Sequence, residues 1–272
     1  MRLDDLRARR REEALERGHN PRDVDLLLSH VTQRSVSWII AHGDELLDAE
    51  TLDALLRRRY EGEPIQYIRG ATEFYSREFV VDDRVLIPRP ETELVVEAAL
   101  ERAPNGGLVV DVGTGSGCIA ISIERERPDL RVVALDRSLD ALAVATVNRR
   151  RLNARVRFAA ADLLSCLRER VDVIVSNPPY VPLDEYETLA VEVRIHEPRM
   201  ALTPGPRGTE LIDRMLEQAL TLLAPAGCMI IEVGYGQEEA IRKLAAMRGF
   251  HVEAFIPDLA AIPRVVVLSA HG

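Results

Sequence analysis

The sequence is poor in cysteine, in lysine and in long apolar runs, and these shortages exclude several classes of protein. Its three cysteines, Cys118, Cys166 and Cys228, are widely spaced and odd in number, which indicates a reducing compartment without a disulfide framework. No CxxC or HExxH pattern occurs, so we expect no metal site. No apolar run approaches the roughly 18 residues of a membrane span. The first residues also lack the apolar segment of a secretory signal. We therefore expect a cytoplasmic protein with no membrane partner.

Positive charge is also in short supply. The 272 residues carry 35 basic and 44 acidic side chains, a net charge of −9, and Lys243 is the single lysine. Residues 1–85 hold 14 arginines and 18 acidic residues. Proteins that grip nucleic acid through phosphates usually present a basic face. This balance disfavours direct nucleic-acid binding, while 47% hydrophobic residues indicate an ordinary globular core.

The periodicity of apolar residues divides the chain into three regions. Residues 1–70 show leucines and alanines at three-to-four spacing, which predicts a small helical bundle. Residues 71–90 predict a β-hairpin that joins the domains, with its turn around Asp82-Asp83. Residues 91–272 alternate strand and helix patterns, so we predict an α/β domain with a doubly wound, mostly parallel, seven-stranded sheet. The expected strands are 108–112, 131–136, 156–160, 171–176, 229–233, 251–255 and 265–269, and the helices include 94–102, 139–152 and 211–223.

A glycine-rich loop follows the first of these strands. It reads Asp111-Val112-Gly113-Thr114-Gly115-Ser116-Gly117 and opens a helix. Glycines let the backbone turn tightly and approach a ligand closely. The GxGxG spacing differs from the GxGxxG of dinucleotide sites. It suits a ligand without phosphates, such as an adenosine with an amino-acid tail. The alternative is a tight turn with no ligand.

Acidic residues follow the next two strands. Asp136 ends the second strand, where a carboxylate can accept both ribose hydroxyls; the alternative is a helix N-cap. Asp162 and Leu163 follow the third strand. Asp162 could accept from an adenine amino group and Leu163 could pack on the ring, although acidic residues after strands are common on surfaces.

The segment Asn177-Pro178-Pro179-Tyr180 directly follows the apolar strand 171–176. The side-chain oxygen of Asn177 and the carbonyl of Pro178 can each accept one N–H of a planar NH2 group. Tyr180 offers a flat surface to pack on the substrate. Such a site holds the nitrogen with its π face toward an incoming methyl group. The alternative is a proline-rich turn that caps the strand.

The chain resembles the glutamine methyltransferases that modify peptide-chain release factors, the PrmC/HemK-like family. The glycine loop and the Asn-Pro-Pro-Tyr segment are shared with other amino-methyltransferases, including adenine-specific DNA enzymes. Greater specificity comes from Ile87-Pro88-Arg89-Pro90-Glu91-Thr92-Glu93 and from the helical amino-terminal region. Further matching segments are 64–68, Phe74-Tyr75, Glu197-Pro198 and Pro263-Arg264.

The resemblance implies a Rossmann-like class I methyltransferase domain and S-adenosylmethionine as donor, with S-adenosylhomocysteine as product and no metal. It implies transfer to the N5 amide nitrogen of the glutamine in the release factor's Gly-Gly-Gln loop, and an amino-terminal domain that binds the release factor. The implied donor-binding residues are Asp111, Gly113, Thr114, Gly115, Ser116, Gly117, Asp136, Asp162, Leu163 and Asn177. The implied catalytic residues are Asn177, Pro178 and Tyr180, and Pro179, Arg89 and Glu91 complete the substrate site.

The sequence departs from the family pattern at two places. Leu163 stands where relatives often carry an aromatic residue, and residues 202–209 depart from a usual Gly-Gly-x-x-Gly run.

Two rival functions remain. An adenine-N6 DNA methyltransferase would use the same Asn-Pro-Pro-Tyr arrangement on a flipped base. A non-catalytic module that binds S-adenosylmethionine is the second rival, although donor binding alone does not need acceptors for an amine.

Overall fold

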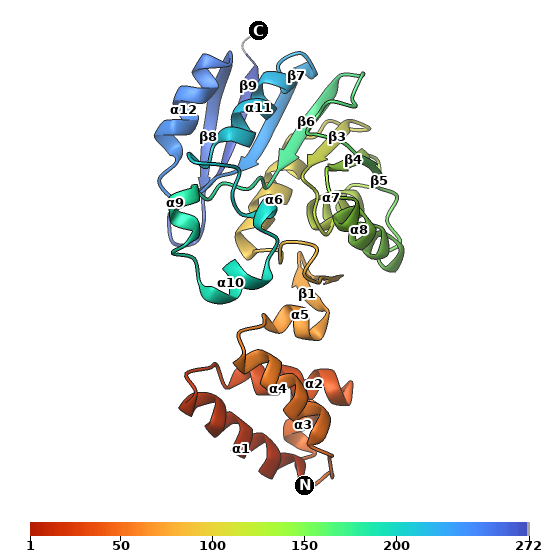
Figure 1. Ribbon diagram of the computed structural model, residues 1–272. Coiled ribbons are helices and arrows are strands. Elements are labelled where there is room, and N and C mark those ends of the chain that lie inside the picture. Colours follow the sequence, from red (N-terminus) through yellow and green to blue (C-terminus); the bar gives the residue numbers. More distant parts are fainter. Residues whose placement is uncertain (271–272) are drawn as a thin grey trace. The chain divides into compact units, whose positions relative to one another are not determined.

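The computed structural model describes residues 1–270, which form two compact units (Figure 1). The first unit contains Met1–Gly70 together with Val191–His196, and the second contains Ala71–Ala190 and the chain from Glu197 onward. A short helical segment from the later part of the chain therefore belongs to the amino-terminal unit. Nothing in the local sequence of that segment signals this.

The first unit is helical, as its leucine spacing predicts. Its helices are α1 (Leu3–Glu16), α2 (Arg22–Thr32), α3 (Val36–Ala41), α4 (Glu50–Tyr60), α5 (Ile65–Arg69) and α10 (Val191–His196). Its core consists of apolar side chains from α1 to α5, including Leu3, Leu6, Leu27, Leu28, Leu52 and Leu56. Arg59 of α4 lies between Asp23 of α2, at 2.7 Å, and Glu192 of α10, at 2.8 Å. Its side chain is only 14% exposed, so this ion pair attaches α10 to the bundle.

The second unit begins with a β-hairpin. Strands β1 (Ala71–Phe74) and β2 (Arg77–Val80) pair in antiparallel fashion. The turn lies at Tyr75 and Ser76, whose φ angles are 49° and 57°, so the prediction of a turn at Asp82-Asp83 was wrong. Two-residue hairpin turns with positive φ usually carry Asn, Asp or Gly, and this one has neither a glycine nor an asparagine to reveal it. Phe74 and Phe79 are fully buried, which makes the hairpin part of this unit's core.

A seven-stranded sheet organises the second unit. Its strands are β3 (Leu108–Val112), β4 (Arg131–Asp136), β5 (Arg157–Ala160), β6 (Val171–Ser176), β7 (Leu223–Glu232), β8 (Phe250–Pro257) and β9 (Pro263–Ala270). The order is β5-β4-β3-β6-β7-β9-β8, and β9 runs antiparallel to both neighbours while the other pairs are parallel. The predicted doubly wound, mostly parallel sheet is confirmed. Its order reverses between β3 and β6, and ligands bind at such a switch point.

Helices cover both faces of this sheet (Figure 1). The helices of the second unit are α6 (Glu93–Arg102), α7 (Cys118–Glu126), α8 (Leu139–Arg151), α9 (Leu183–Tyr186), α11 (Glu210–Ala219) and α12 (Glu238–Met247), with single 3-10 turns η1 (Pro90–Thr92) and η2 (Arg199–Ala201). Val109 of β3 packs with α6 and α7, whereas Val110 packs with α11 and α12. Successive strand residues point to opposite faces, and both faces are apolar. The helix predicted at 211–223 ends at Ala219, because β7 begins at Leu223.

Candidate active site

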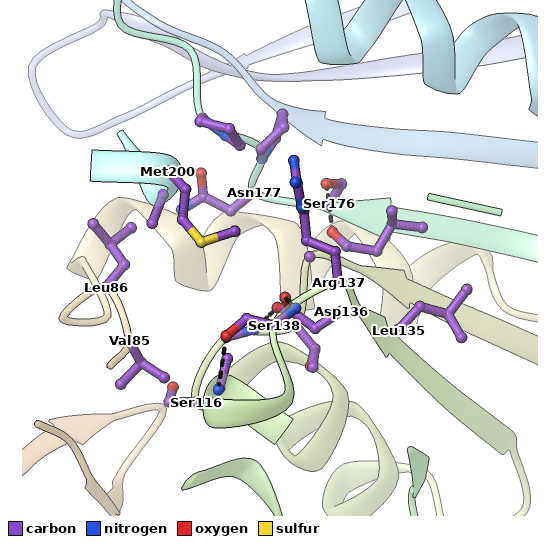
Figure 2. A pocket seen from close by; sticks show the side chains of 18 of the residues that line it. Val85, Leu86, Ser116, Leu135, Asp136, Arg137, Ser138, Ser176, Asn177 and Met200 are labelled. Carbon is purple, nitrogen blue, oxygen red and sulfur yellow. Dashed lines mark hydrogen bonds between the residues drawn. The ribbon is translucent and has the colours of Figure 1, made fainter. Parts of the chain in front are cut away.

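A cavity opens in the second unit at the carboxyl ends of β3, β4 and β6. Figure 2 shows Asp136 and Ser138 on one side of it, with Asn177 and Met200 across from them. The sequence-predicted residues that line it are Gly113, Thr114, Gly115, Ser116, Asp136, Asp162, Leu163, Asn177, Pro178 and Pro179. Within residues 1–270, the lining does not include Asp111, Gly117, Tyr180, Arg89 or Glu91. Residues from three separate strand ends thus meet around one space.

The glycine loop is held in place by β4. The backbone N–H groups of Gly113 and Thr114 both donate to the carbonyl of Leu135, at 2.8 and 3.0 Å. Gly113 and Gly115 have φ angles of 75° and 54°, and a Cβ on either would meet no protein atom within 4 Å. A Cβ there would project into open space, so the loop leaves room for a ligand close to its backbone. This fits a cradle for a small molecule.

Asp136 supports the loop and faces the cavity. Its Oδ2 accepts the N–H of Gly115 and its Oδ1 accepts the N–H of Ser138, both at 2.9 Å. The N-cap of α8 is Ser138, whose hydroxyl oxygen accepts the N–H of Ala141 at 3.2 Å. A carboxylate offers about four lone-pair sites. Asp136 therefore keeps capacity to accept from ligand hydroxyls.

Asp111 lies behind the loop. It is fully buried, and its Oδ2 accepts the hydroxyl of Thr114 at 2.6 Å. Burial raises the pKa of Asp111 to about 7. Its position indicates that it shapes the loop through Thr114, and it does not line the cavity in the described chain.

The next wall of the cavity carries Asp162 and Leu163. Asp162 is exposed, and its Oδ2 accepts from Nη2 of Arg214 on α11 at 2.5 Å. Leu163 adopts a positive φ of 52°, a conformation that branched and bulky residues rarely adopt. Both residues line the cavity, and their contact with adenine stays a prediction. Arg214 is an additional neighbour that the sequence pattern did not indicate.

The Asn-Pro-Pro-Tyr segment extends from the end of β6 along the cavity. The Nδ2 of Asn177 donates to Oγ1 of Thr92 at 3.0 Å, which leaves Oδ1 as the acceptor of this side chain. The hydroxyl of Tyr180 donates to Oε1 of Glu232 at 3.3 Å, and its carbonyl accepts from Nε2 of Gln237 at 2.9 Å. Burial and the neighbouring Glu232 carboxylate raise the pKa of Tyr180. The tyrosine is thus held at both its ring end and its backbone.

The sequence analysis missed Thr92, Glu232 and Gln237. Glu232 is 2% exposed, and its Oε2 accepts the hydroxyl of Thr92 at 2.6 Å. Burial raises the pKa of Glu232 to about 7. A signal for two of them existed, since Glu232 and Gln237 flank the carboxyl end of β7, the edge at which β6 presents Asn177.

Arg89 and Glu91 lie outside the described lining of the cavity. A side-chain nitrogen of Arg89 donates to the carboxylate of Glu197, which is almost fully buried. The other oxygen of Glu197 accepts the backbone N–H of Ile87 at 3.3 Å. Glu197 therefore fixes the backbone before Arg89 as well as its guanidinium.

The loop that departs from the expected glycine run packs against Tyr180. Gly208 has a φ of +74°, and a Cβ on it would lie 2.4 Å from the carbonyl oxygen of Tyr180. The backbone of residues 202–205 also pairs with this segment, since Val181 N–H donates to Leu202 and Leu183 N–H donates to Gly205. Gly208 is therefore required in this loop, because any side chain there would collide with the backbone of Tyr180.

In the part of the chain that the structure describes, no cluster of three His, Cys, Asp or Glu side chains could hold a metal ion. No helix among residues 1–270 has the length and apolar character needed to cross a membrane.

The fold and the glycine loop define a class I methyltransferase domain. Residues 90–209 match the model of the methyltransferase small domain, and residues 7–70 match that of the PrmC N-terminal domain. A methyltransferase from Pyrococcus furiosus has a similar fold, with a TM-score of 0.56 at 17% identity over 79% of this chain and 98% of that one.

Curated relatives narrow the class to one family. A release factor glutamine methyltransferase of Koribacter versatilis is 41% identical over 90% of this chain and 89% of its own length. One from Neisseria gonorrhoeae is 40% identical over 90% and 92%, and one from Escherichia coli K12 is 39% identical over 85% of each. The chain belongs to the release factor glutamine methyltransferase family.

Proposed function

We propose that the chain transfers a methyl group from S-adenosylmethionine to the side-chain amide nitrogen of the glutamine in the Gly-Gly-Gln loop of peptide-chain release factors. The observation that carries this proposal is the direction of the Asn177 amide. Its Nδ2 is engaged by Thr92, so its Oδ1 is available to a substrate N–H at the cavity wall. The curated relatives are named for this activity.

The donor would bind at the glycine loop. Gly113 and Gly115 leave the space for it, Asp136 would accept its ribose hydroxyls, and Asp162 with Leu163 would contact its adenine. When bound, S-adenosylmethionine supplies an electrophilic methyl on a sulfonium and leaves as S-adenosylhomocysteine. The glycine loop and Asn177 line the same cavity. A donor bound at the loop would therefore lie beside the substrate nitrogen, as direct transfer requires.

The Asn-Pro-Pro-Tyr segment would bind the substrate glutamine. An amide nitrogen is a poor nucleophile because its lone pair is delocalised. Oδ1 of Asn177 and the carbonyl of Pro178 would accept both N–H groups and hold the nitrogen for in-line attack. These N–H groups become more acidic as the methyl transfers, so both acceptors bind more tightly in the transition state. The nitrogen–methyl bond would form as the sulfur–methyl bond breaks, and the nitrogen would lose one of its two protons to solvent. Tyr180 would pack on the amide plane, with Pro179, Arg89 and Glu91 nearer the protein substrate.

Labelled methyl transfer tests the proposal. The enzyme would be offered a purified release factor, the same factor with its Gly-Gly-Gln glutamine changed to alanine, and duplex DNA. We expect label in the first only, and mass spectrometry places it on that glutamine. Label on adenine would replace the substrate, and donor binding without transfer to any of the three would favour the non-catalytic module.

Substitution of Asn177 separates its role from donor binding. Asn177→Ala removes the acceptor aimed at the reacting nitrogen, so we expect kcat to fall by about 100-fold or more. The Kd for S-adenosylmethionine, measured by calorimetry, should change only a few-fold. Asn105→Ala, at an exposed asparagine, is the control. Equal losses of kcat and donor affinity would contradict the assigned role.

A further inference from the structure

A buried hydrogen-bonded chain lies directly behind the Asn-Pro-Pro-Tyr segment. Asn177 donates to Thr92 at 3.0 Å, and Thr92 donates to Glu232 at 2.6 Å. Tyr180 donates to the other oxygen of Glu232 at 3.3 Å. These residues come from η1, from the segment after β6 and from the end of β7. One carboxylate therefore ends two chains that begin at substrate-facing side chains.

The direction of these bonds sets the direction of the Asn177 amide. An ionised carboxylate can only accept, so the Thr92 hydroxyl proton must point at Glu232. The oxygen of Thr92 can then only accept from Asn177, and Nδ2 is the donor of that side chain. Oδ1 of Asn177 is left facing away from Thr92. Without the carboxylate charge, the Thr92 hydroxyl can rotate. Thr92 can then bond either Nδ2 or Oδ1 of Asn177, so the direction of the amide is no longer fixed.

We propose that Glu232 is a positioning residue which, through Thr92, fixes the Asn177 amide with Oδ1 toward the substrate nitrogen. Through the Tyr180 hydroxyl it also holds the ring that packs on the substrate amide. This inference rests on the proposed function. It adds a requirement for charge at a residue that does not line the cavity in the described chain.

Several charged and titratable groups face Glu232. Glu91 on η1 disfavours its ionised form and Arg264 on β9 favours it, while Tyr180 hydrogen-bonds to it and Cys118 of α7 lies close enough to interact electrostatically. Burial outweighs the favourable contacts and brings the pKa of Glu232 to about 7. The orienting charge is therefore present above neutral pH and lost below it.

Steady-state kinetics tests the chain with three variants. Glu232→Gln and Thr92→Val keep the shape but remove the charge or the hydroxyl, and we expect kcat to fall by about 10- to 100-fold, as for other small misplacements of a reacting group. Thr92→Ser keeps the hydroxyl and should stay within about threefold of wild type. Donor affinity should be unchanged in all three. The wild-type kcat should rise with pH through about 7, and Glu232→Gln should remove that rise.

A control variant tests whether removing any buried carboxylate changes the pH dependence of kcat. Glu124 of α7 is 3% exposed and accepts from Arg155 at 2.8 Å. Glu124→Gln should retain the wild-type pH profile. A rise in kcat that survives in Glu232→Gln, or Thr92→Ser activity as low as that of Thr92→Val, would overturn the proposal.

A second measurement does not depend on turnover. The chain has five asparagines, so selective 15N labelling gives five side-chain NH2 pairs, with Asn177 assigned by its substitution. We expect that pair to shift with a midpoint near pH 7, and to lose the shift in Glu232→Gln. The buried Asn148, bonded to Val80 and Ser116, should not shift. A flat Asn177 titration would refute the coupling, whereas absence of methyl transfer by wild type would refute only the proposed function.

Discussion

The buried charge of Glu232 should lower the stability of the protein at neutral and alkaline pH. Its pKa rises from an ordinary value of 4.5 to about 7 in the fold, chiefly because burial disfavours the ionised form. A raised carboxyl pKa means that the folded state binds more protons than the unfolded state between these values. The protonated Glu232 carboxyl therefore makes its full contribution to the free energy of unfolding below pH 4.5, and this contribution is lost as the pH rises through about 7. The full difference corresponds to about 3 kcal/mol.

Glu232→Gln removes this dependence while keeping the volume and the capacity to bond Thr92 and Tyr180. Urea unfolding of wild type and variant at pH 5, 6, 7 and 8 would give the free energy of unfolding at each pH. We expect the variant to gain on wild type as the pH rises, by about 3 kcal/mol between pH 5 and 8. Such a variant would be more stable and less active, as expected where a functional group destabilises the folded protein.

Two results would refute the reasoning. A difference between wild type and Glu232→Gln that does not change with pH would show that Glu232 titrates as it does in the unfolded chain. A variant that loses stability at every pH would show that the carboxylate is a net structural contribution. Asp111, whose pKa is also about 7, titrates in both proteins, so its effect cancels in this comparison.

Three further substitutions test the site and its support. Gly208→Ala should lower kcat by about 10-fold or more in the methyl-transfer assay, because its Cβ would meet Tyr180; Gly236→Ala, with a φ of +75° and no atom within 4 Å, should show only strain, and equal effects would contradict the contact. Asp136→Ala should weaken donor binding by about 10-fold or more in calorimetry, and unchanged affinity would remove it from the donor site. Asn148→Ala should lower the free energy of unfolding in urea by about 3 kcal/mol, since three hydrogen bonds of a buried amide are lost; a loss below about 0.5 kcal/mol would show that these bonds are replaced.

Local sequence was sufficient where the determinants are local. Alternating strand and helix patterns predicted the sheet, and four of the seven expected strands match within one residue at each end: 108–112, 131–136, 156–160 and 171–176. The glycine loop and Asn177 follow their strands as read from the sequence, because a chain that leaves a parallel strand must emerge at its carboxyl end. The hairpin turn was misplaced because Tyr75 and Ser76 carry no turn signal for their positive φ.

The sequence by itself therefore determined the strands, the helices and the two motifs, since each depends on neighbours a few residues away. Only the tertiary structure decided which side chains complete the site. Thr92 and Asn177 are 85 residues apart, and Thr92 and Glu232 are 140 apart. They meet because β7 pairs with β6 and because η1 packs beside their ends. That pairing depends on the burial of whole strands. The place of Glu232 at the end of a strand indicates that it lies near the site, but no local pattern shows that its carboxylate is buried and bonded to Thr92.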